Sequence, residues 1–418
     1  MSFETVSVIG LGYIGLPTAA MFASRKKKVI GVDINQHAVD TINQGKIHIV
    51  EPELDIIVNA VVKEGYFKAV TVPEVADAFL IAVPTPFLPC DEGEAPSPDL
   101  SYIEAASKAI APVLRKGNLV ILESTSPVGT TEKMAEWLAQ ARSDLTFPQT
   151  HGELADVNVA HCPERVLPGH VVRELVDNDR VIGGLTRKCS MRSIELYKSF
   201  VQGDCVVTNA RTAEMAKLTE NSCRDVQIAF ANELSLICDD LDIDVWELIR
   251  LANRHPRVNI LQPGPGVGGH CIAVDPWFIV DSCPEKSNII KQARITNDSK
   301  PNYVTSKITK LASGIDEPTI ACLGLSFKAD IDDLRESPAV QIVKKLATEQ
   351  LGKIIVVEPN INILPVDLST LNIELVNIEQ AIERANIISV LVDHKEFKLI
   401  QKDQVENKII IDTKGIWQ

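Results

Sequence analysis

Apolar and polar residues along the first half of this chain form blocks with two different periods. Short apolar runs, typical of buried strands, alternate with longer segments whose apolar residues recur at the helical period. This alternation predicts a parallel sheet with helices on both faces. Strands are expected at 5–10, 28–33, 79–83, 119–122, 157–160 and 180–183, and helices at 14–25, 37–43, 100–114 and 131–141.

The pattern changes after Asn209. Residues 212–241 keep the helical period with neither Pro nor Gly, which predicts one long helix that bridges two domains or forms a dimer interface. After Pro301 strands and helices alternate again, which predicts a second α/β domain. Further helices are expected at 245–253, 301–313, 338–349 and 378–384, and further strands at 319–324, 353–358, 387–392 and 408–412.

The charge and composition exclude several classes of protein. In 418 residues, 42 Lys and Arg stand against 56 Asp and Glu, and the net charge of −14 repels nucleic acid and anionic lipid. No apolar run reaches the roughly 18 residues of a membrane span, and the chain begins without the pattern of a secretory signal. We therefore expect a cytoplasmic protein without nucleic-acid or membrane partners.

The nine cysteines indicate neither disulfides nor a metal site. None forms a C-x-x-C pair. The adjacent pairs His161-Cys162 and His270-Cys271 lack further residues at ligand spacing, so no metal is expected.

A glycine-rich segment follows the first predicted strand and opens the first predicted helix. In Gly10-Leu-Gly12-Tyr-Ile-Gly15, the glycines permit a tight turn, the approach of a pyrophosphate and close helix packing, in that order. The helix amino terminus adds partial positive charge and N–H donors. Asp33 ends the second predicted strand, where a carboxylate binds ribose hydroxyls and repels a 2′-phosphate. The segment therefore predicts that the cofactor is NAD rather than NADP.

These patterns together predict the α/β class, with two Rossmann-like doubly wound domains joined by a long central helix. An NAD-binding domain is expected at 1–209, a central helical region with the dimer interface and a catalytic loop at 210–300, and the second α/β domain at 301–418.

Two segments carry candidate catalytic groups near the centre of the chain. A second glycine-rich loop presents Cys271, a potential nucleophile, and Asp275, which could handle a proton, while its glycines would let a substrate approach. Lys217, Asn221 and Arg224 lie at i, i+4 and i+7 on one face of the long helix. An ammonium and an amide on that face could stabilise an oxyanion.

Glu164 lies in a third segment with a candidate catalytic group. It follows a predicted strand in Cys162-Pro-Glu164-Arg165 and could act as a general base or position a water.

Seven further motifs follow the first glycine motif in order along the chain. They are Val83-Pro-Thr85-Pro, Glu123-Ser-Thr125, Pro163-Glu164, Glu214-x-x-Lys217-x-x-x-Asn221, Gly268-Gly-His-Cys271-x-x-x-Asp275, Gly324-Leu-Ser-Phe-Lys328 and Asp333-Leu-Arg335-Glu-Ser337. With these motifs the chain resembles the NAD-dependent UDP-sugar and GDP-sugar 6-dehydrogenases over nearly its whole length. Its catalytic loop is most similar to the branch that acts on UDP-N-acetylhexosamines and serves bacterial surface-polysaccharide synthesis.

The resemblance implies a four-electron oxidation of a sugar CH2OH to a carboxylate in two stages. In the first stage an aldehyde forms, with proton removal assisted by Lys217, Asp275 or water. In the second, Cys271 forms a thiohemiacetal that is oxidised to a thioester, and water activated near Glu164 or Asp275 hydrolyses it. Lys217 and Asn221 would hold the oxyanion.

The resemblance also implies the binding residues, a UDP-sugar-binding role for residues 301–418, and a homodimer. The residues expected to bind NAD are Gly10, Gly12, Tyr13, Ile14, Gly15, Asp33, Thr85, Thr125 and Arg335. The residues expected to bind the UDP-sugar are Arg165, Lys217, Asn221, Arg224, His255, Arg257, Gly268 and Lys328.

The chain departs from this family's pattern at two positions. Pro168 replaces a second glutamate that many UDP-glucose dehydrogenases carry, so water activation cannot be shared between two glutamates. His270 replaces a serine before the cysteine, which could alter the sugar pocket or the thiol pKa.

UDP-N-acetyl-D-mannosamine is the expected substrate. UDP-glucose and UDP-N-acetylglucosamine are the alternatives within the family, because residue spacing does not reveal pocket shape. A non-catalytic nucleotide-sugar sensor would have no use for a nucleophile. An ordinary two-electron hydroxyacid dehydrogenase would need neither the cysteine nor the second α/β domain.

Overall fold

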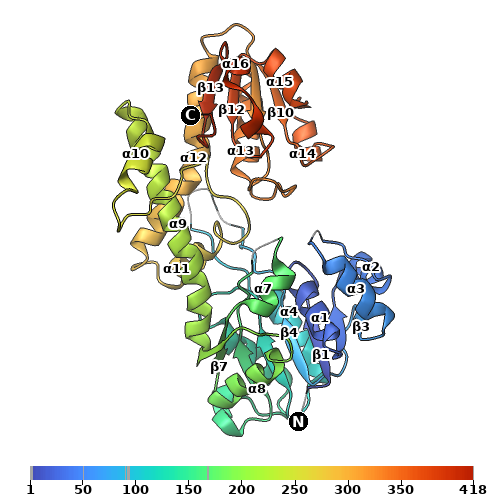
Figure 1. Cartoon of the computed structure of the whole chain (residues 1–418). Helices are drawn as coiled ribbons and strands as arrows, with labels where there is room; N and C mark the ends of the chain where they lie inside the picture. Colours follow the sequence, from blue (N-terminus) through green and yellow to red (C-terminus); the bar gives the residue numbers. More distant parts are fainter. Residues whose placement is uncertain (1–2, 50, 90, 92–94, 167–168, 418) are drawn as a thin grey trace. The chain divides into compact units, whose positions relative to one another are not determined.

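The computed structural model describes residues 3–49, 51–89, 91, 95–166 and 169–417. The chain folds into two compact units, Met1–Glu220 with Asp281–Cys283, and Asn221–Val280 with Pro284–Gln418. Each unit contains one sheet flanked by helices (Figure 1). The long helix α9 (Ala210–Asp240) contributes residues to both units, because the division falls within it.

The first unit is built on an eight-stranded sheet in the order β3-β2-β1-β4-β5-β6-β7-β8. The predicted parallel arrangement is confirmed for every pair except β6 and β7, which are antiparallel. The direction of winding reverses between β1 and β4, and ligands of such sheets bind beyond the carboxyl ends of the strands at this point. The strands are β1 (Thr5–Ile9), β2 (Lys28–Val32), β3 (Phe67–Val70), β4 (Ala78–Ile81), β5 (Leu119–Leu122), β6 (Asn158–His161), β7 (Arg180–Gly184) and β8 (Cys205–Asn209).

Apolar residues on both faces of this sheet form two cores. Val8 belongs to one core and its neighbour Ile9 to the other, as expected for a strand buried on both sides. The helices that cover the sheet are α1 (Gly15–Ser24), α2 (Gln36–Asn43), α3 (Leu54–Lys63), α4 (Ser101–Ile110), η1 (Ala111–Val113), α5 (Thr130–Ala141), α6 (Pro148–His151), η2 (Gly152–Leu154), α7 (Val171–Asp177) and α8 (Arg187–Tyr197).

The second unit begins within α9 and includes α10 (Val245–Ala252), most of α11 (Asp275–Ser282) and α12 (Asn288–Ala312). Helix α12 continues through Pro301, although the sequence predicts a helix that starts there. Proline disfavours a helix interior, but Pro301 is buried among residues that pack on both sides of it, and this packing outweighs the local preference.

The second sheet has five parallel strands in the order β11-β10-β9-β12-β13, with cores on both faces. The elements are β9 (Thr319–Leu323), α13 (Pro338–Glu349), β10 (Lys353–Val357), α14 (Val366–Ser369), β11 (Glu374–Leu375), α15 (Ile378–Arg384), β12 (Ile387–Val390), η3 (Phe397–Leu399), α16 (Lys402–Val405) and β13 (Ile409–Asp412).

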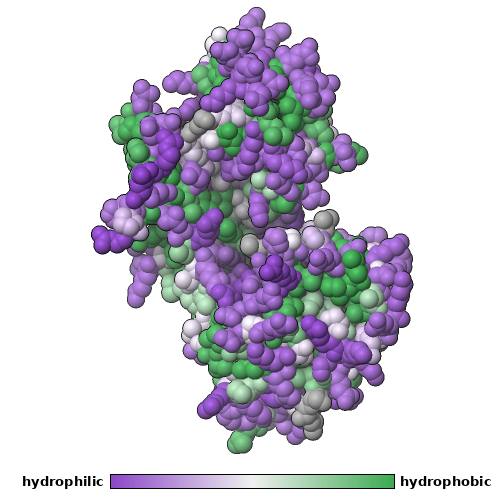
Figure 2. Space-filling model, in the orientation of Figure 1, coloured by the Kyte–Doolittle hydropathy of each residue, from purple (hydrophilic) through white to green (hydrophobic). Residues whose placement is uncertain are grey.

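The surface of the protein is mostly polar on the face drawn in Figure 2. Apolar side chains form separate patches on this face.

Candidate active site

The chain packs closely around two glycines of the motif that leads from β1 into α1, and it leaves open space beside the third. Gly10 has φ +90°, and a Cβ there would lie 2.6 Å from the carbonyl oxygen of Ala82. A Cβ on Gly15 would lie 1.8 Å from the carbonyl oxygen of Gly10. At Gly12, by contrast, no described atom lies within 4 Å of an added Cβ. The open position before α1 therefore fits the approach of a pyrophosphate.

Asp33 closes the glycine turn from the end of β2. Its Oδ2 accepts a hydrogen bond from Leu11 N and its Oδ1 from Asn35 N, both at 2.9 Å. The carboxylate is thereby held beside the glycine segment, where a ribose would follow the pyrophosphate.

Several other residues predicted to bind NAD lie at the carboxyl ends of strands in the first unit. Thr85 follows β4, and its Oγ1 is buried without a hydrogen-bond partner among the described residues. Thr125 follows β5 and is half-buried, as is Ile14 before α1, while Tyr13 is exposed. An orphaned buried hydroxyl and the open position at Gly12 both fit a bound dinucleotide. Arg335 belongs to the second unit and pairs with Asp333 at 2.6 Å.

Glu164 lies in a buried charge cluster after β6. Its Oε2 is 2.6 Å from Nη1 of the fully buried Arg180, and its Oε1 accepts from Arg165 N at 2.7 Å. Tyr197 donates to Oε1 of Glu123 at 2.6 Å, and this oxygen lies 4.0 Å from the same Nη1 of Arg180. Burial raises the pKa of Glu123 to about 7, and the nearby Glu164 adds to the rise while Arg180 opposes it. Both oxygens of Glu164 are thus engaged. Pro168 lies outside the described residues.

Two glutamates of α9 connect this helix to the rest of the first unit. Glu220 pairs with Arg165 through two contacts, Nη2 to Oε1 at 2.6 Å and Nε to Oε2 at 3.1 Å. Glu214 is buried and accepts hydrogen bonds from Gly129 N and from the backbone and hydroxyl of Thr131, so it caps α5. In this structure Arg165 therefore contacts α9.

The polar face of α9 differs from the predicted one. Lys217 is half-buried, and no residue in the described part of the chain pairs with its ammonium group. Asn221 lies one turn further along and is also half-buried, but Arg224 is exposed. The inward face continues instead through Asp225, which is fully buried.

Asn221 joins this helix face to the glycine-rich segment at 264–275 that contains Cys271, here named the cysteine loop. Its Nδ2 donates to Oδ2 of Asp275 at 2.5 Å. Asp275 is the first residue of α11, and its backbone N–H donates to the carbonyl oxygen of Cys271 at 2.9 Å. The side chain of Cys271 is exposed, whereas Asp275 is buried. The structure thus brings Asn221, Asp275 and Cys271 together in one unit.

The glycines of the cysteine loop accommodate another part of the second unit. A Cβ on Gly268 would lie 2.4 Å from the carbonyl oxygen of Glu336, and one on Gly269, where φ is +83°, would lie 3.0 Å from the ring of Phe327. At these two glycines the approach that the sequence suggested for a substrate is made by the chain itself. The cysteine loop is therefore packed against residues 327–336 of the segment that follows β9.

His270 faces the same segment. Its ring lies 6.5 Å from that of Phe327, at an interplanar angle of 77°. Burial and the nearby Arg335 both lower the pKa of His270, so the imidazole is neutral at pH 7. A neutral ring adds no positive charge beside Cys271.

The remaining residues predicted to bind the substrate lie on exposed loops of the second unit. His255 and Arg257 follow α10, and Arg257 N donates to Nδ1 of His255 at 3.3 Å. Lys328 follows β9, and its carbonyl oxygen accepts from Ser326 Oγ at 2.7 Å. All three side chains are exposed and available to an anionic ligand, and Lys328 follows Phe327, whose ring lies against the cysteine loop.

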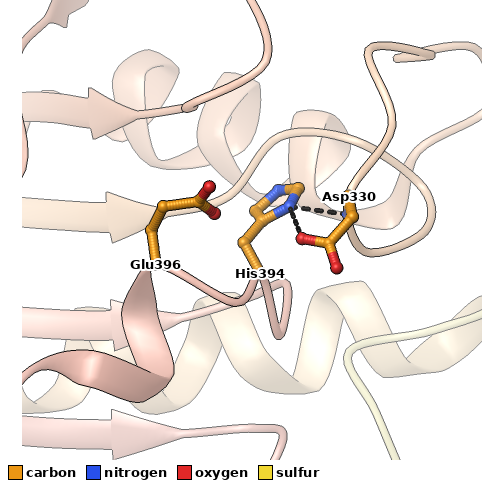
Figure 3. Close-up of side chains that lie close together, drawn as sticks. All are labelled: Asp330, His394 and Glu396. Carbon is orange, nitrogen blue, oxygen red and sulfur yellow. Dashed lines mark hydrogen bonds and ion pairs between the residues drawn. The ribbon is translucent and has the colours of Figure 1, made fainter.

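A cluster of Asp330, His394 and Glu396 has a spacing that could hold a cation (Figure 3). The imidazole is already committed, because Nδ1 accepts from Asp330 N at 2.9 Å and Nε2 therefore donates to Glu358 at 3.0 Å. Glu358 also accepts from Leu325 N at 2.8 Å. Glu358 thus holds the loop before Lys328, and His394 offers no lone pair to a metal.

Comparison with known proteins assigns three long stretches of the chain to the domains of one family. Residues 4–201, 211–299 and 321–418 match the NAD binding domain, the central domain and the UDP binding domain of the UDP-glucose/GDP-mannose dehydrogenase family. The chain belongs to this family. It is therefore an NAD-dependent nucleotide-sugar dehydrogenase, as the motifs predicted. No helix in the described ranges combines the length and the apolar character that a membrane crossing needs.

Members of this family are similar to the chain over its full length. The UDP-N-acetyl-D-mannosamine dehydrogenase of Campylobacter jejuni is 68% identical over 96% of this chain and 98% of its own. The NDP-N-acetyl-D-galactosaminuronic acid dehydrogenase of Ralstonia nicotianae is 63% identical over 100% and 97%. The solved structure of UDP-D-ManNAc dehydrogenase from Pyrococcus horikoshii is 39% identical, with a TM-score of 0.86 over 99% of this chain and 96% of that one.

Sequence reasoning missed buried charged residues in each of the two units. Arg180, Asp225 and Arg294 are charged but almost wholly buried. A charged residue inside an otherwise apolar helix face or strand is the signal that could have identified them.

Proposed function

We propose that this protein oxidises C6 of UDP-N-acetyl-D-mannosamine twice, to the level of a carboxylate. The observation that carries this proposal is the hydrogen bond from Asn221 to Asp275, because it joins the oxyanion-binding face of α9 to the loop of Cys271. The similarity to mannosamine dehydrogenases over the full chain supports the choice of sugar.

Cys271 is proposed to carry the second stage of the reaction. Its thiolate adds to the C6 aldehyde, which gives a thiohemiacetal. Loss of a hydride and a proton from that adduct gives a thioester. Water then attacks the thioester, the C–S bond breaks, and the carboxylate and the thiolate are released. The exposed position of Cys271 after a glycine-rich loop supports this role.

Lys217 and Asn221 are proposed to stabilise the negative oxygen at C6. An ammonium and an amide N–H one helical turn apart can both donate to an oxyanion. We assign water activation to Asp275 rather than Glu164, because both oxygens of Glu164 are engaged by Arg180 and Arg165 N. Asp275 lies only one turn after the cysteine.

The cofactor-binding residues are proposed to be Gly10, Gly12, Gly15, Asp33 and Thr85. NAD, when bound, supplies the hydride acceptor. Gly12 and the start of α1 would bind the pyrophosphate, and Asp33 would bind the ribose. Its carboxylate would exclude a 2′-phosphate.

Exposed basic residues are proposed to bind the diphosphate of the UDP-sugar. Arg257 and Lys328 are exposed on a protein whose net charge is −14, so they offer local positive charge to an anionic substrate. Arg224 and His255 are further candidates, whereas Arg165 would have to leave Glu220 to take part.

We also propose a homodimer that forms along α9, in the cytoplasm. Phe230 and Ile237 are 54% and 46% exposed one heptad apart, which leaves an apolar stripe on the outer side of the helix. Substitution of Phe230 by Glu should convert the dimer to a monomer in sedimentation experiments. A wild-type protein that sediments as a monomer would exclude this proposal.

A second sugar is favoured by one observation. A relative that is 63% identical over the full chain is an NDP-N-acetyl-D-galactosaminuronic acid dehydrogenase. UDP-N-acetylgalactosamine is therefore the second candidate substrate.

The deciding experiment measures NADH formed per sugar consumed, by absorbance. UDP-N-acetylmannosamine, UDP-N-acetylgalactosamine, UDP-N-acetylglucosamine, UDP-glucose and GDP-mannose are assayed in parallel. Two NADH per UDP-N-acetylmannosamine, with slower turnover of the others, is expected. One NADH per sugar would contradict the thioester mechanism, and no NADH with any sugar would favour a nucleotide-sugar sensor.

A further inference from the structure

Helices α9 and α12 meet through buried polar side chains at the level of the cysteine loop. Arg294, Asp225, Asn297 and Asn232 are all fully buried. Their contacts are within the second unit. A fully buried arginine is uncommon, and it is retained only where its charge is paired.

Each member of this set contacts the next. Arg294 donates from Nη1 to Oδ1 of Asp225 at 2.5 Å, and from Nη2 to Asp298. Asn297 donates to the same Oδ1 of Asp225 at 2.8 Å and accepts from Asn232 at 2.8 Å. We name Asp225, Asn232, Arg294 and Asn297 the Arg294 network.

The Arg294 network contacts the cysteine loop on both sides of Cys271. Asn232 Oδ1 accepts from Gly264 N at 2.9 Å, at the start of the loop. Arg294 Nη1 approaches the carbonyl oxygen of Ile272, the residue after Cys271, at 3.5 Å. Cys271 therefore lies in a segment that the Arg294 network contacts at residue 264 and again at residue 272.

Stability alone does not account for these charges. Burial raises the pKa of Asp225 to about 6, although Arg294 opposes the rise. Taking two charges out of water costs about as much as their attraction returns, so apolar residues of similar volume often hold a core equally well. Side chains with directional hydrogen bonds, in contrast, can hold a glycine-rich backbone in one position.

We propose that the Arg294 network is the positioning element of the cysteine loop. It does not touch the substrate. It holds the backbone at residues 264 and 272 so that Cys271 stays at the distance and angle that attack on the aldehyde requires, since small displacements of a reacting group cost large factors in rate. This inference rests on the catalytic role proposed for Cys271.

The main test replaces Asn232 by Ala. We expect kcat to fall at least about tenfold while the KM values for NAD and the UDP-sugar stay within about threefold, because the binding residues lie elsewhere. Hydrogen exchange of the peptide that contains Gly264 should become faster, because its N–H loses its acceptor.

Ser235→Ala is the matched control. Ser235 lies on α9 one turn after Asn232 and accepts from Lys300 of α12 at 2.7 Å, so it joins the same two helices without contacting the loop. We expect a comparable change in melting temperature but no change in kcat or in exchange at Gly264. An equal loss of kcat in both variants would overturn the proposal.

The double variant Asp225→Leu with Arg294→Met separates positioning from packing. It removes the buried charges together, so its melting temperature should exceed that of either single variant. We expect kcat to stay low and exchange at Gly264 to stay fast. If both kcat and the slow exchange at Gly264 recovered in the double variant, the Arg294 network would only fill space. If the double variant does not fold, Asn232→Ala decides.

The exchange measurements need no substrate. A wild-type protein that forms no NADH would therefore contradict the proposed function and leave the Arg294 network to be judged by loop exchange alone. Normal loop exchange in Asn232→Ala would overturn the inference even if the proposed function holds.

Discussion

Asn221 Nδ2 donates to Oδ2 of Asp275 at 2.5 Å, and Asp275 N donates to the carbonyl oxygen of Cys271 at 2.9 Å. A side chain in the middle of a long helix thus holds the carboxylate of Asp275, which lies one turn after Cys271. The two residues are 54 positions apart. The contact between Asn221 and Asp275 joins two motifs that are far apart in the sequence.

Replacement of Asn221 by Ala removes the donor to Asp275 and one donor to the proposed oxyanion. We expect kcat to fall about 100-fold, the usual cost of losing one such donor, with little change in the KM for NAD. Steady-state NADH formation measures both. Gln227→Ala, on the exposed side of the same helix, should retain full activity. A kcat within about twofold of wild type would exclude the role assigned to Asn221.

Replacement of Cys271 by Ser should separate the two stages. A hydroxyl is a far weaker nucleophile than a thiolate, so the aldehyde should accumulate or remain as a slowly resolving adduct. NADH formed per sugar should fall from two toward one in a single-turnover assay. Cys223→Ser, which changes an exposed thiol on α9, is the control. Formation of the acid at the wild-type rate would disprove the thioester mechanism.

Replacement of Asp33 by Ala should weaken NAD binding. The carboxylate closes the glycine turn through Leu11 N and is proposed to bind ribose, so its loss should raise the KM for NAD about tenfold. Initial rates at varied NAD test this, with Asp40→Ala on the exposed face of α2 as the control. An unchanged KM would mean that the ribose binds elsewhere.

Replacement of Gly268 by Ala should displace the cysteine loop. The new Cβ would lie 2.4 Å from the carbonyl oxygen of Glu336, a backbone atom that cannot rotate away. Such overpacking typically costs about 1–3 kcal/mol, and kcat should fall with the melting temperature. Gly314→Ala is the control, because its nearest described atom lies 3.8 Å away. Full activity of Gly268→Ala would show that the loop tolerates movement.

The pair of Glu358 and His394 should make the second unit sensitive to acid. Burial alone would raise the pKa of Glu358, but hydrogen bonds from His394 and Leu325 N outweigh it and hold the pKa at about 2, below the ordinary value of 4.5. The stabilisation is therefore present above pH 4.5 and is lost as the pH falls toward 2.

The melting temperatures of wild type and Glu358→Gln, recorded from pH 7 to pH 3, test this pair. The difference between them should be largest near pH 7 and should shrink below pH 4.5, where the unfolded wild-type carboxyl binds its proton. A difference that does not change with pH would mean that the ionised carboxylate contributes nothing specific.

Most elements of both sheets could be predicted from the sequence, because a strand buried on both faces is a nearly continuous apolar run. The boundaries of β5, α13 and α15 are as predicted. The edge strand β8 was missed, because its apolar run is only Cys205-Val206-Val207, and Val206 and Val207 are about half exposed at the edge of the sheet. The start of α12 was wrong because Pro301 dominated the local pattern, while its burial among packed residues keeps the helix continuous.

By itself the sequence determined the residue types that are proposed to perform chemistry and their local spacing. The glycine motif, Asp33, Lys217, Asn221, Cys271 and Asp275 are local patterns whose meaning depends on a few neighbours in the chain. Only the tertiary structure decided what holds them. Asp225 rather than Arg224 lies on the buried side of α9, Glu164 is committed to Arg180, and Gly268 makes room for Glu336. These arrangements depend on contacts between residues that are far apart in the chain, and the spacing of residues along the sequence does not predict such contacts. They also depend on burial, which determines the strength of each contact.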